Sequence, residues 1–110
     1  MSGTEPNEII ELPCYVAGEQ IGIQPLDVFY PYTGEVAGRV RQVTRAGLEK
    51  ALVSTQPVEM SRWDRHEVLN KARILLGERS EEFAQLIRSE SGLCMRETHY
   101  EVGRAQDVLQ

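Results

Sequence analysis

Cys94 is the residue of this sequence best placed for nucleophilic chemistry, because His99 follows it five positions later and Arg96 lies between them. A thiol becomes a nucleophile when a neighbouring base or positive charge favours its thiolate form. The position also suits a packing role, because Cys94 follows Gly92, which ends a helix, and has apolar neighbours on both sides. Cys14 lies among strand-type residues and forms neither a Cys-x-x-Cys pair nor a disulfide framework with Cys94. We therefore predict that both cysteines are structural.

His66 and His99 are the two histidines, and each has an acidic residue two positions before it, Asp64 and Glu97. Imidazole and carboxylate groups together are typical zinc ligands. Histidines that share a metal on one helix face are about four positions apart, whereas these two are 33 positions apart. The spacing favours solvated helix histidines, and we predict no metal site.

Two Gly-x-x-x-Gly pairs and one basic segment are the remaining features that could bind phosphate. Neither Gly18 with Gly22 nor Gly34 with Gly38 lies where a strand passes into a helix, so neither forms a dinucleotide-binding turn. Residues 62–65 have alternating charges around one tryptophan, which is typical of a solvated helix start. The chain has 12 Lys and Arg residues against 17 Asp and Glu residues, and this net charge of -5 disfavours a nucleic-acid partner. We predict no catalytic, cofactor-binding or metal-binding residues in this sequence.

The elements that would position these side chains begin with a flexible leader, which we predict over residues 1–11. Residues 12–43 contain short β-favouring runs bounded by glycine and proline, which predict three or four strands. Residues 18–20 are predicted to be the tight connection between the first two strands. Residues 31–34, Pro-Tyr-Thr-Gly, give the strongest turn signal, because proline fixes the φ of the second turn position and glycine gives the end of the turn conformational freedom.

Helical periodicity begins at Thr44 and predicts helices over residues 44–56, 62–78, 80–90 and 96–110. Thr44 and Ser61 suit N-cap positions, and Gly92 suits the end of the third helix. The second and third helices carry an apolar stripe. The stripe consists of Val68, Leu69, Ala72, Leu75, Leu76, Phe83, Leu86 and Ile87.

The length of 110 residues suits one domain or part of one. No segment approaches the roughly 20 apolar residues that a membrane-spanning helix needs, and residues 1–6 lack the pattern of a signal peptide. We therefore expect a soluble cytoplasmic protein with no membrane partner. The last helical pattern reaches Gln110 without the Gly, Asn or Pro that usually ends a helix, so we expect the chain to be part of a longer protein.

Several segments, taken in order, resemble one known family. Residues 29–40 resemble the Asn-Pro-x-Thr-Gly-Glu turn and the following strand of the NAD(P)-dependent aldehyde dehydrogenases, with Tyr30 where Asn is usual. The similarity extends from Leu12 to Gln110 and corresponds to the N-terminal portion of the family's sequence. The other matching segments are residues 14–19, 44–52, 65–92 and 101–109.

The resemblance implies an α+β fragment of an α/β protein. Its N-terminal β-hairpin strands and its three or four helices would pack on a Rossmann-type cofactor domain and towards an oligomer interface. The implied partners are therefore the rest of the subunit and further copies of it. The whole enzyme would oxidise an aldehyde to a carboxylic acid with NAD or NADP, whereas this fragment is expected to bind neither cofactor.

The family's catalytic groups match no position in this sequence. Its nucleophilic cysteine, general-base glutamate and Gly-rich cofactor turn lie further along, so the resemblance implies an inactive fragment with a structural role. Some relatives hold a monovalent cation with strand carbonyls and a helix acid, which would fall on Val28, Phe29 and Glu101.

Residues 90–94 and 100–104 resemble the branch that acts on phosphonoacetaldehyde-type substrates. The alternative is a stand-alone α+β module that binds a protein partner through its apolar surface.

Overall fold

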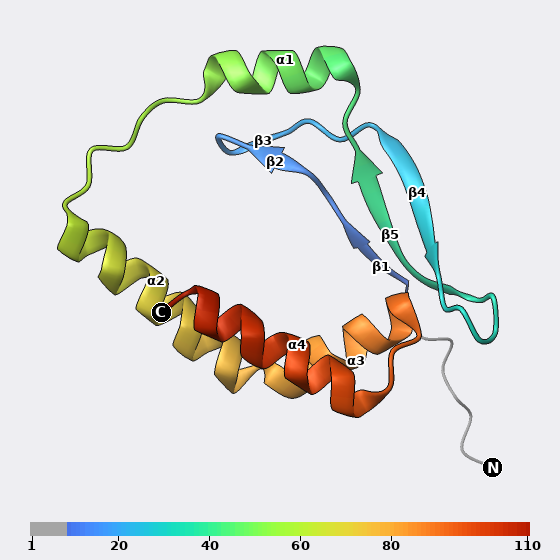
Figure 1. The fold of residues 1–110 in the computed structure, drawn as a ribbon. Coiled ribbons are helices and arrows are strands. Elements are labelled where there is room, and N and C mark those ends of the chain that lie inside the picture. Colours follow the sequence, from blue (N-terminus) through green and yellow to red (C-terminus); the bar gives the residue numbers. More distant parts are fainter. Residues whose placement is uncertain (1–8) are drawn as a thin grey trace. The chain divides into compact units, whose positions relative to one another are not determined.

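The computed structural model describes residues 9–110, and the chain divides into two compact units. The first unit ends at Gln56 and the second begins at Pro57. A boundary suits this position, because proline disfavours α geometry in the residue that precedes it. The described strands and helix α1 (Arg45–Ser54) lie in the first unit, and three helices lie in the second (Figure 1).

Strand β5 (Val36–Gln42) is the central strand of a three-stranded sheet in the first unit. Strand β4 (Gln24–Phe29) pairs with it in antiparallel orientation, and the register shifts between Val28 and Phe29. Strand β1 (Ile10–Leu12) pairs with the other side of β5 in parallel orientation. Both neighbours of β5 therefore depend on the hydrogen-bonding groups of one seven-residue strand.

The predicted leader of residues 1–11 is too long at its C-terminal end. Ile10 and Glu11 belong to β1, where they lie in register with Gly38 and Arg39 of β5. The edge of β5 offers backbone amide and carbonyl groups that need partners, and a three-residue strand is enough to pair with them. Residues 1–8 of the predicted leader lie outside the described residues.

A separate hairpin joins β2 (Tyr15–Val16) to β3 (Glu19–Gln20). Its two-residue turn is Ala17-Gly18, with φ values of +50° and +81°. Positive φ at both central positions defines a type I′ turn, whose twist matches that of the paired strands. The prediction that residues 18–20 form the connection was wrong, because two polar residues gave no strand signal for β3. The described residues accordingly contain five strands, where three or four were predicted.

The predicted turn at residues 31–34 is confirmed, and it connects β4 to β5. The amide of Tyr30 donates to the carbonyl of Glu35 at 2.8 Å, and the amide of Gly34 donates to the carbonyl of Tyr30 at 2.8 Å. Gly34 has a φ of +74°, a conformation that glycine adopts without steric cost. Proline at the start of this turn and glycine at its end thus act as the sequence indicated.

Helix α1 begins after Thr44, whose side chain accepts a hydrogen bond from the amide of Gly47 at 3.1 Å. This bond satisfies one of the amides that the first turn leaves without a helical partner. Ala51 is buried, whereas Leu48 and Leu52 are exposed. The helix is therefore fixed at its start but covers little apolar surface with its own unit.

Three helices form the second unit: α2 (Arg62–Glu78), α3 (Ser80–Ser91) and α4 (Met95–Val108). Ser61 caps α2 in the predicted way, because its hydroxyl oxygen accepts from the amide of Asp64 at 3.0 Å. Gly92 ends α3 with a φ of +75°. Helix α4 packs against both other helices. The predicted order of strands followed by helices is confirmed, and each observed helix bound lies within two residues of its predicted position.

The core formed by the described residues is small. Its buried apolar residues are Ala51, Ala84 and Val102, and Thr98 is also buried, with its hydroxyl bonded to the carbonyl of Met95 at 2.9 Å. The predicted apolar stripe is only partly covered, and its uncovered members include Val68 and Leu75, which are 57% and 48% exposed. Among the described residues, the helices are too short or too polar to cross a membrane.

Replacing Ala17 with Asn is expected to stabilise the first hairpin. Alanine at positive φ places its Cβ close to the backbone, whereas asparagine tolerates this region and Asn-Gly is a favoured pair for a type I′ turn. We expect the free energy of unfolding to rise by roughly 0.5–1 kcal/mol, measured by urea denaturation. Gly18→Ala is the matched control and should lower stability, because Gly18 also has positive φ. A less stable Ala17→Asn variant would contradict the turn assignment.

Candidate functional site

Cys94 and His99, the residues that the sequence singled out for nucleophilic chemistry, both lie at the start of α4. Cys94 is exposed at the N-cap of α4, and His99 lies on α4 with its Nε2 atom 3.1 Å from Oε2 of Glu81 on α3. The imidazole thus contacts a carboxylate rather than the thiol. Cys14 is half-buried between β1 and β2. The His99–Glu81 contact links α3 to α4 and does not activate a nucleophile.

His66 also has a structural neighbour, because its ring centroid lies 5.7 Å from that of Trp63 on the first turns of α2. The acids that precede the two histidines are engaged separately. Oδ2 of Asp64 accepts from the hydroxyl of Ser61 at 2.6 Å, and Oε1 of Glu97 lies 3.2 Å from Nη2 of Arg96. Among residues 9–110, the His, Cys, Asp and Glu side chains form no cluster of three or more that could hold a metal ion.

The residues of the predicted cation site belong to different units. Val28 and Phe29 lie at the β-bulge of β4 in the first unit, where the ladder with β5 is interrupted. Glu101 lies on α4 in the second unit, with Oε1 at 3.8 Å from Nη1 of Arg104. The monovalent cation site therefore stays a prediction.

A groove between α2 and α4 is the candidate site that the second unit provides. It has a volume of about 410 Å³. We call it the α2–α4 groove. Its lining residues are Arg73, Tyr100, Gly103, Arg104, Gln106, Asp107 and Gln110.

The two guanidinium groups give the α2–α4 groove its chemical character. Nε and Nη2 of Arg73 donate to the side-chain oxygen of Asn70 at 3.1 and 2.9 Å, a neutral partner that leaves the positive charge in place. Arg104 forms an ion pair with Glu101, whose Oε1 lies 3.8 Å from Nη1, a distance too long for a hydrogen bond. Asp107 is the acidic residue of the lining. Guanidinium groups in this setting are suited to binding carboxylate, sulfonate or phosphonate oxygens.

The sequence did not reveal this groove. Arg73 and Arg104 are 31 positions apart and line the same groove only because α4 packs against α2. The one local signal is the four-residue spacing of Tyr100 and Arg104, which places both on one face of a helix.

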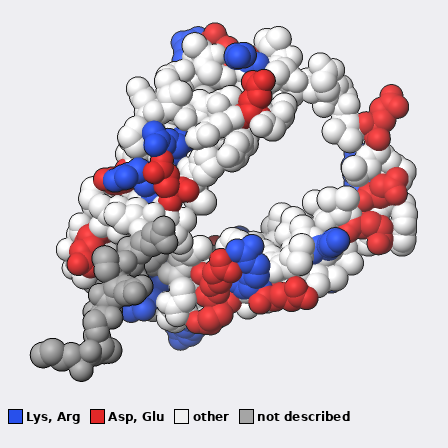
Figure 2. All heavy atoms as spheres, turned by 180° about the vertical axis from the view of Figure 1, so that it is seen from behind, with Lys and Arg blue, Asp and Glu red and all other residues white. Residues whose placement is uncertain are grey.

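Elsewhere the charged side chains are mixed in sign. On the face that Figure 2 shows, acidic and basic residues are interspersed along the elements. This face therefore does not concentrate positive charge as binding to a phosphate backbone requires.

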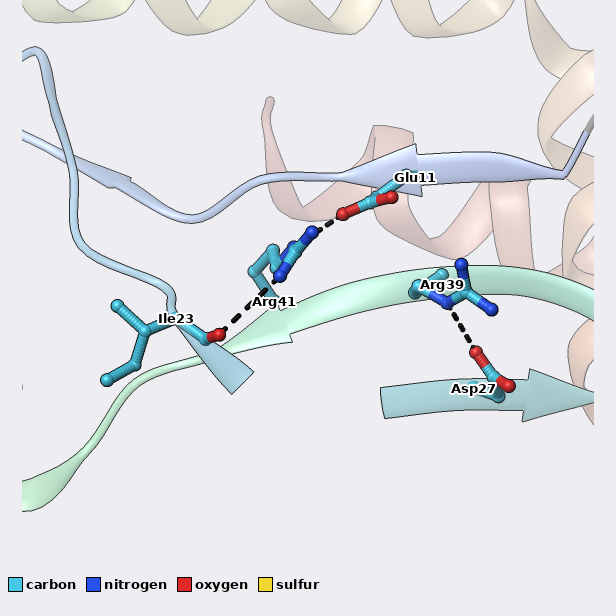
Figure 3. Close-up of polar contacts among 5 residues, drawn as sticks. All are labelled: Glu11, Ile23, Asp27, Arg39 and Arg41. Atoms are coloured by element: carbon cyan, nitrogen blue, oxygen red, sulfur yellow. Dashed lines mark hydrogen bonds and ion pairs between the residues drawn. The ribbon is translucent and has the colours of Figure 1, made fainter. Parts of the chain in front are cut away.

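Two ion pairs cross the three-stranded sheet on the same face (Figure 3). Nε of Arg39 on β5 donates to Oδ1 of Asp27 on β4 at 2.6 Å. Arg41 pairs with Glu11 on β1, and its Nη1 atom lies 3.5 Å from the carbonyl oxygen of Ile23. The central strand is thus tied to both neighbours by charge as well as by backbone pairing.

The Asp27–Arg39 pair shifts both pKa values. The hydrogen bond from the guanidinium lowers the pKa of Asp27 below its ordinary value, and the same bond raises the pKa of Arg39. Both shifts favour the charged forms, which is expected of a cross-strand pair that stabilises a sheet.

A solved dehydrogenase contains a segment with this arrangement of strands and helices. The chain superimposes on aldehyde dehydrogenase 21 from Physcomitrella patens, solved in complex with the reaction product succinate, with a TM-score of 0.81 and 30% sequence identity. The match covers 93% of this chain and 23% of that structure. The α+β fragment predicted from the sequence therefore corresponds to part of a larger dehydrogenase fold.

The sequence itself matches the model of the aldehyde dehydrogenase family over residues 15–110. The chain therefore belongs to the aldehyde dehydrogenase family, as its motifs indicated.

Two curated relatives show how much of the family's length is present. A 3-sulfolactaldehyde dehydrogenase from Priestia megaterium is 33% identical over 111 residues, covering 97% of this chain and 23% of the relative. Malonate-semialdehyde dehydrogenase 1 from Geobacillus kaustophilus is 29% identical over 119 residues, covering 100% of this chain and 24% of the relative. The chain thus spans about a quarter of the length of these relatives.

The pH dependence of the free energy of unfolding should show how much the Asp27–Arg39 pair contributes to stability. A carboxyl group with a lowered folded-state pKa contributes stability above its unfolded pKa of about 4, and this contribution is lost as the pH falls through the folded-state value. The stability difference between the native chain and Asp27→Asn should therefore be largest near neutral pH and shrink below about pH 4, measured by urea denaturation.

Glu49→Gln is the matched control, because the Arg45–Glu49 pair is largely exposed on α1 and should contribute little at any pH. If the native chain and Asp27→Asn differ in free energy of unfolding by the same amount at neutral and acidic pH, the role assigned to the pair is contradicted.

Proposed function

We propose that this chain is a structural segment of an aldehyde dehydrogenase subunit. The subunit would oxidise an aldehyde to a carboxylic acid, with water supplying the second oxygen atom, NAD or NADP accepting the hydride, and one proton being released. The family match over residues 15–110 carries this proposal. The groups that perform the chemistry would be supplied by the remainder of the subunit, because the relatives are about four times longer than the matched segment. Assembly with further copies in the cytoplasm belongs to the same proposal.

The uncovered apolar surface supports a structural role for the segment. Large apolar side chains that a helix leaves exposed usually mark a surface that packs against another element. Helix α2 has such side chains, because Trp63, Val68, Ile74 and Leu75 are exposed although α4 already packs against it. Covering such residues is favourable by roughly 25 cal/mol for each Å² removed from water. We propose that the cofactor domain of the complete subunit covers them.

The substrate we propose is a short aldehyde that carries an anionic group. Sulfolactaldehyde bears a sulfonate and malonate semialdehyde a carboxylate, as the names of the two relatives state. The product bound to the related structure, succinate, is a dicarboxylate. A substrate of this class needs a cationic partner for the end of the molecule that does not react. The guanidinium groups of the α2–α4 groove support this assignment, and we propose that Arg104 contacts the anionic group.

The isolated 110-residue chain is expected to be inactive. Purified chain mixed with NAD or NADP and a panel of anionic aldehydes should give no aldehyde-dependent absorbance of the reduced cofactor at 340 nm, whereas the complete subunit should give it. Turnover by the isolated chain would show that the catalytic groups lie within these residues.

In the complete enzyme, Arg104→Gln should weaken the binding of anionic aldehydes. Loss of one hydrogen bond to a charged group costs about 1.5–3 kcal/mol, which corresponds to a rise in KM of roughly 10- to 100-fold for malonate semialdehyde. The KM for an uncharged aldehyde such as propanal should stay within about twofold, because propanal offers no anionic group to the guanidinium.

Arg96→Gln is the matched control, because Arg96 lies on the same helix but outside the groove. Steady-state kinetics on both substrates decide the question. Equal losses on malonate semialdehyde and propanal would refute the proposed contact.

A further inference from the structure

A side-chain hydrogen bond joins the two helices of the α2–α4 groove at the level of its cationic residues. Nε2 of Gln106 on α4 donates to the backbone carbonyl oxygen of Arg73 on α2 at 3.2 Å. Arg73 and Gln106 both line the groove, and Arg104 lies two positions before Gln106 on the same helix. The contact thus connects the backbone that carries one guanidinium group to the helix that carries the other.

Gly77 provides the space in which the Gln106 amide lies. A Cβ atom built on Gly77 would lie 2.5 Å from Nε2 of Gln106, which is closer than such atoms approach. Gly77 lies in the last turn of α2, and its φ is not among the positive values of the described glycines. Glycine is less favourable than alanine at a helical position that does not need positive φ. Space for the amide, rather than backbone conformation, therefore explains a glycine at this position.

We propose that Gln106, held in the space above Gly77, is a positioning residue for the anionic end of the substrate. This inference rests on the proposed function of the groove. The Gln106 amide fixes the register of α4 against α2, and so fixes how far the Arg104 guanidinium lies from that of Arg73. Two cationic groups can share one carboxylate or sulfonate only within a narrow range of separations, because hydrogen bonds weaken steeply outside their preferred distances and angles.

Neither Gln106 nor Gly77 needs to touch the reacting atoms in this role. A displacement of about 1 Å in a substrate-positioning group is enough to change rates or affinities by up to roughly 100-fold. The effect should be confined to substrates that carry an anion, because an uncharged aldehyde does not use the guanidinium pair.

Kinetics of the complete enzyme test the inference with Gln106→Met, Gly77→Ala and the double variant. Methionine matches glutamine in length but lacks the donor, and alanine at 77 displaces the amide. Each single change should raise the KM for malonate semialdehyde about tenfold, with kcat and the KM for propanal within about twofold. The double variant should be no worse than either single variant, because both remove the same contact.

Gln85→Met is the matched control, because Gln85 lies on α3, outside the groove, and its amide donates to Glu81 at 3.0 Å. The Gly77→Ala variant should fold, because alanine favours the helix more than glycine does. Thermal unfolding of every variant shows whether a change in KM could instead come from a loss of stability.

The outcomes distinguish the function of the groove from the positioning role of Gln106. If Arg104→Gln changes the KM for malonate semialdehyde no more than the KM for propanal, the proposed function of the groove fails and the inference fails with it. If Arg104→Gln raises only the KM for malonate semialdehyde, but Gln106→Met and Gly77→Ala leave that KM unchanged, only the positioning role is overturned. A parallel loss on both substrates, or additive losses in the double variant, would also overturn it.

Discussion

Packing two helices together buries only the residues that face each other, and α2 carries apolar side chains on more of its circumference than α4 covers. The contact between them runs along the side of α2 that bears Arg73 and Gly77, and it leaves Val68 and Leu75 exposed. The second unit therefore has polar contacts between its helices, Gln106 with Arg73 and His99 with Glu81, and an apolar surface on α2 that its own helices leave exposed. The same helix pair places Arg73 and Arg104 in the lining of one groove.

In the first unit, the central strand β5 holds the three-stranded sheet together. Residues of β5 alternate between two faces, so Arg39 and Arg41 point to one side while Val40 points to the other. The arginines meet acids on both neighbouring strands, which ties a small sheet together without a large core. The opposite face offers Leu12 and Leu26, both exposed, for packing. Each unit thus has one side whose polar groups contact one another and another side whose apolar side chains stay exposed.

Local signals carried most of what could be predicted from the sequence. Thr44, Ser61 and Gly92 fix helix ends through their own backbone and side-chain chemistry, which is why the helix bounds were predictable. The strand of Glu19 and Gln20 was not, because its residues have no strand preference and are held in place by the turn before them. The α2–α4 groove depends on the approach of two helices, which is set by one glycine and one glutamine 29 positions apart. No pattern within a single segment records such a contact.

The parallel pairing of β1 with β5 has a consequence for the order of folding. Ile10 and Gly38 are partners although they lie 28 positions apart, whereas β4 and β5 are joined by a short turn. Closing the larger loop costs more chain entropy, so the β4–β5 hairpin can form before β1 pairs with β5. During synthesis on a ribosome, β1 therefore emerges first of the three strands but pairs last.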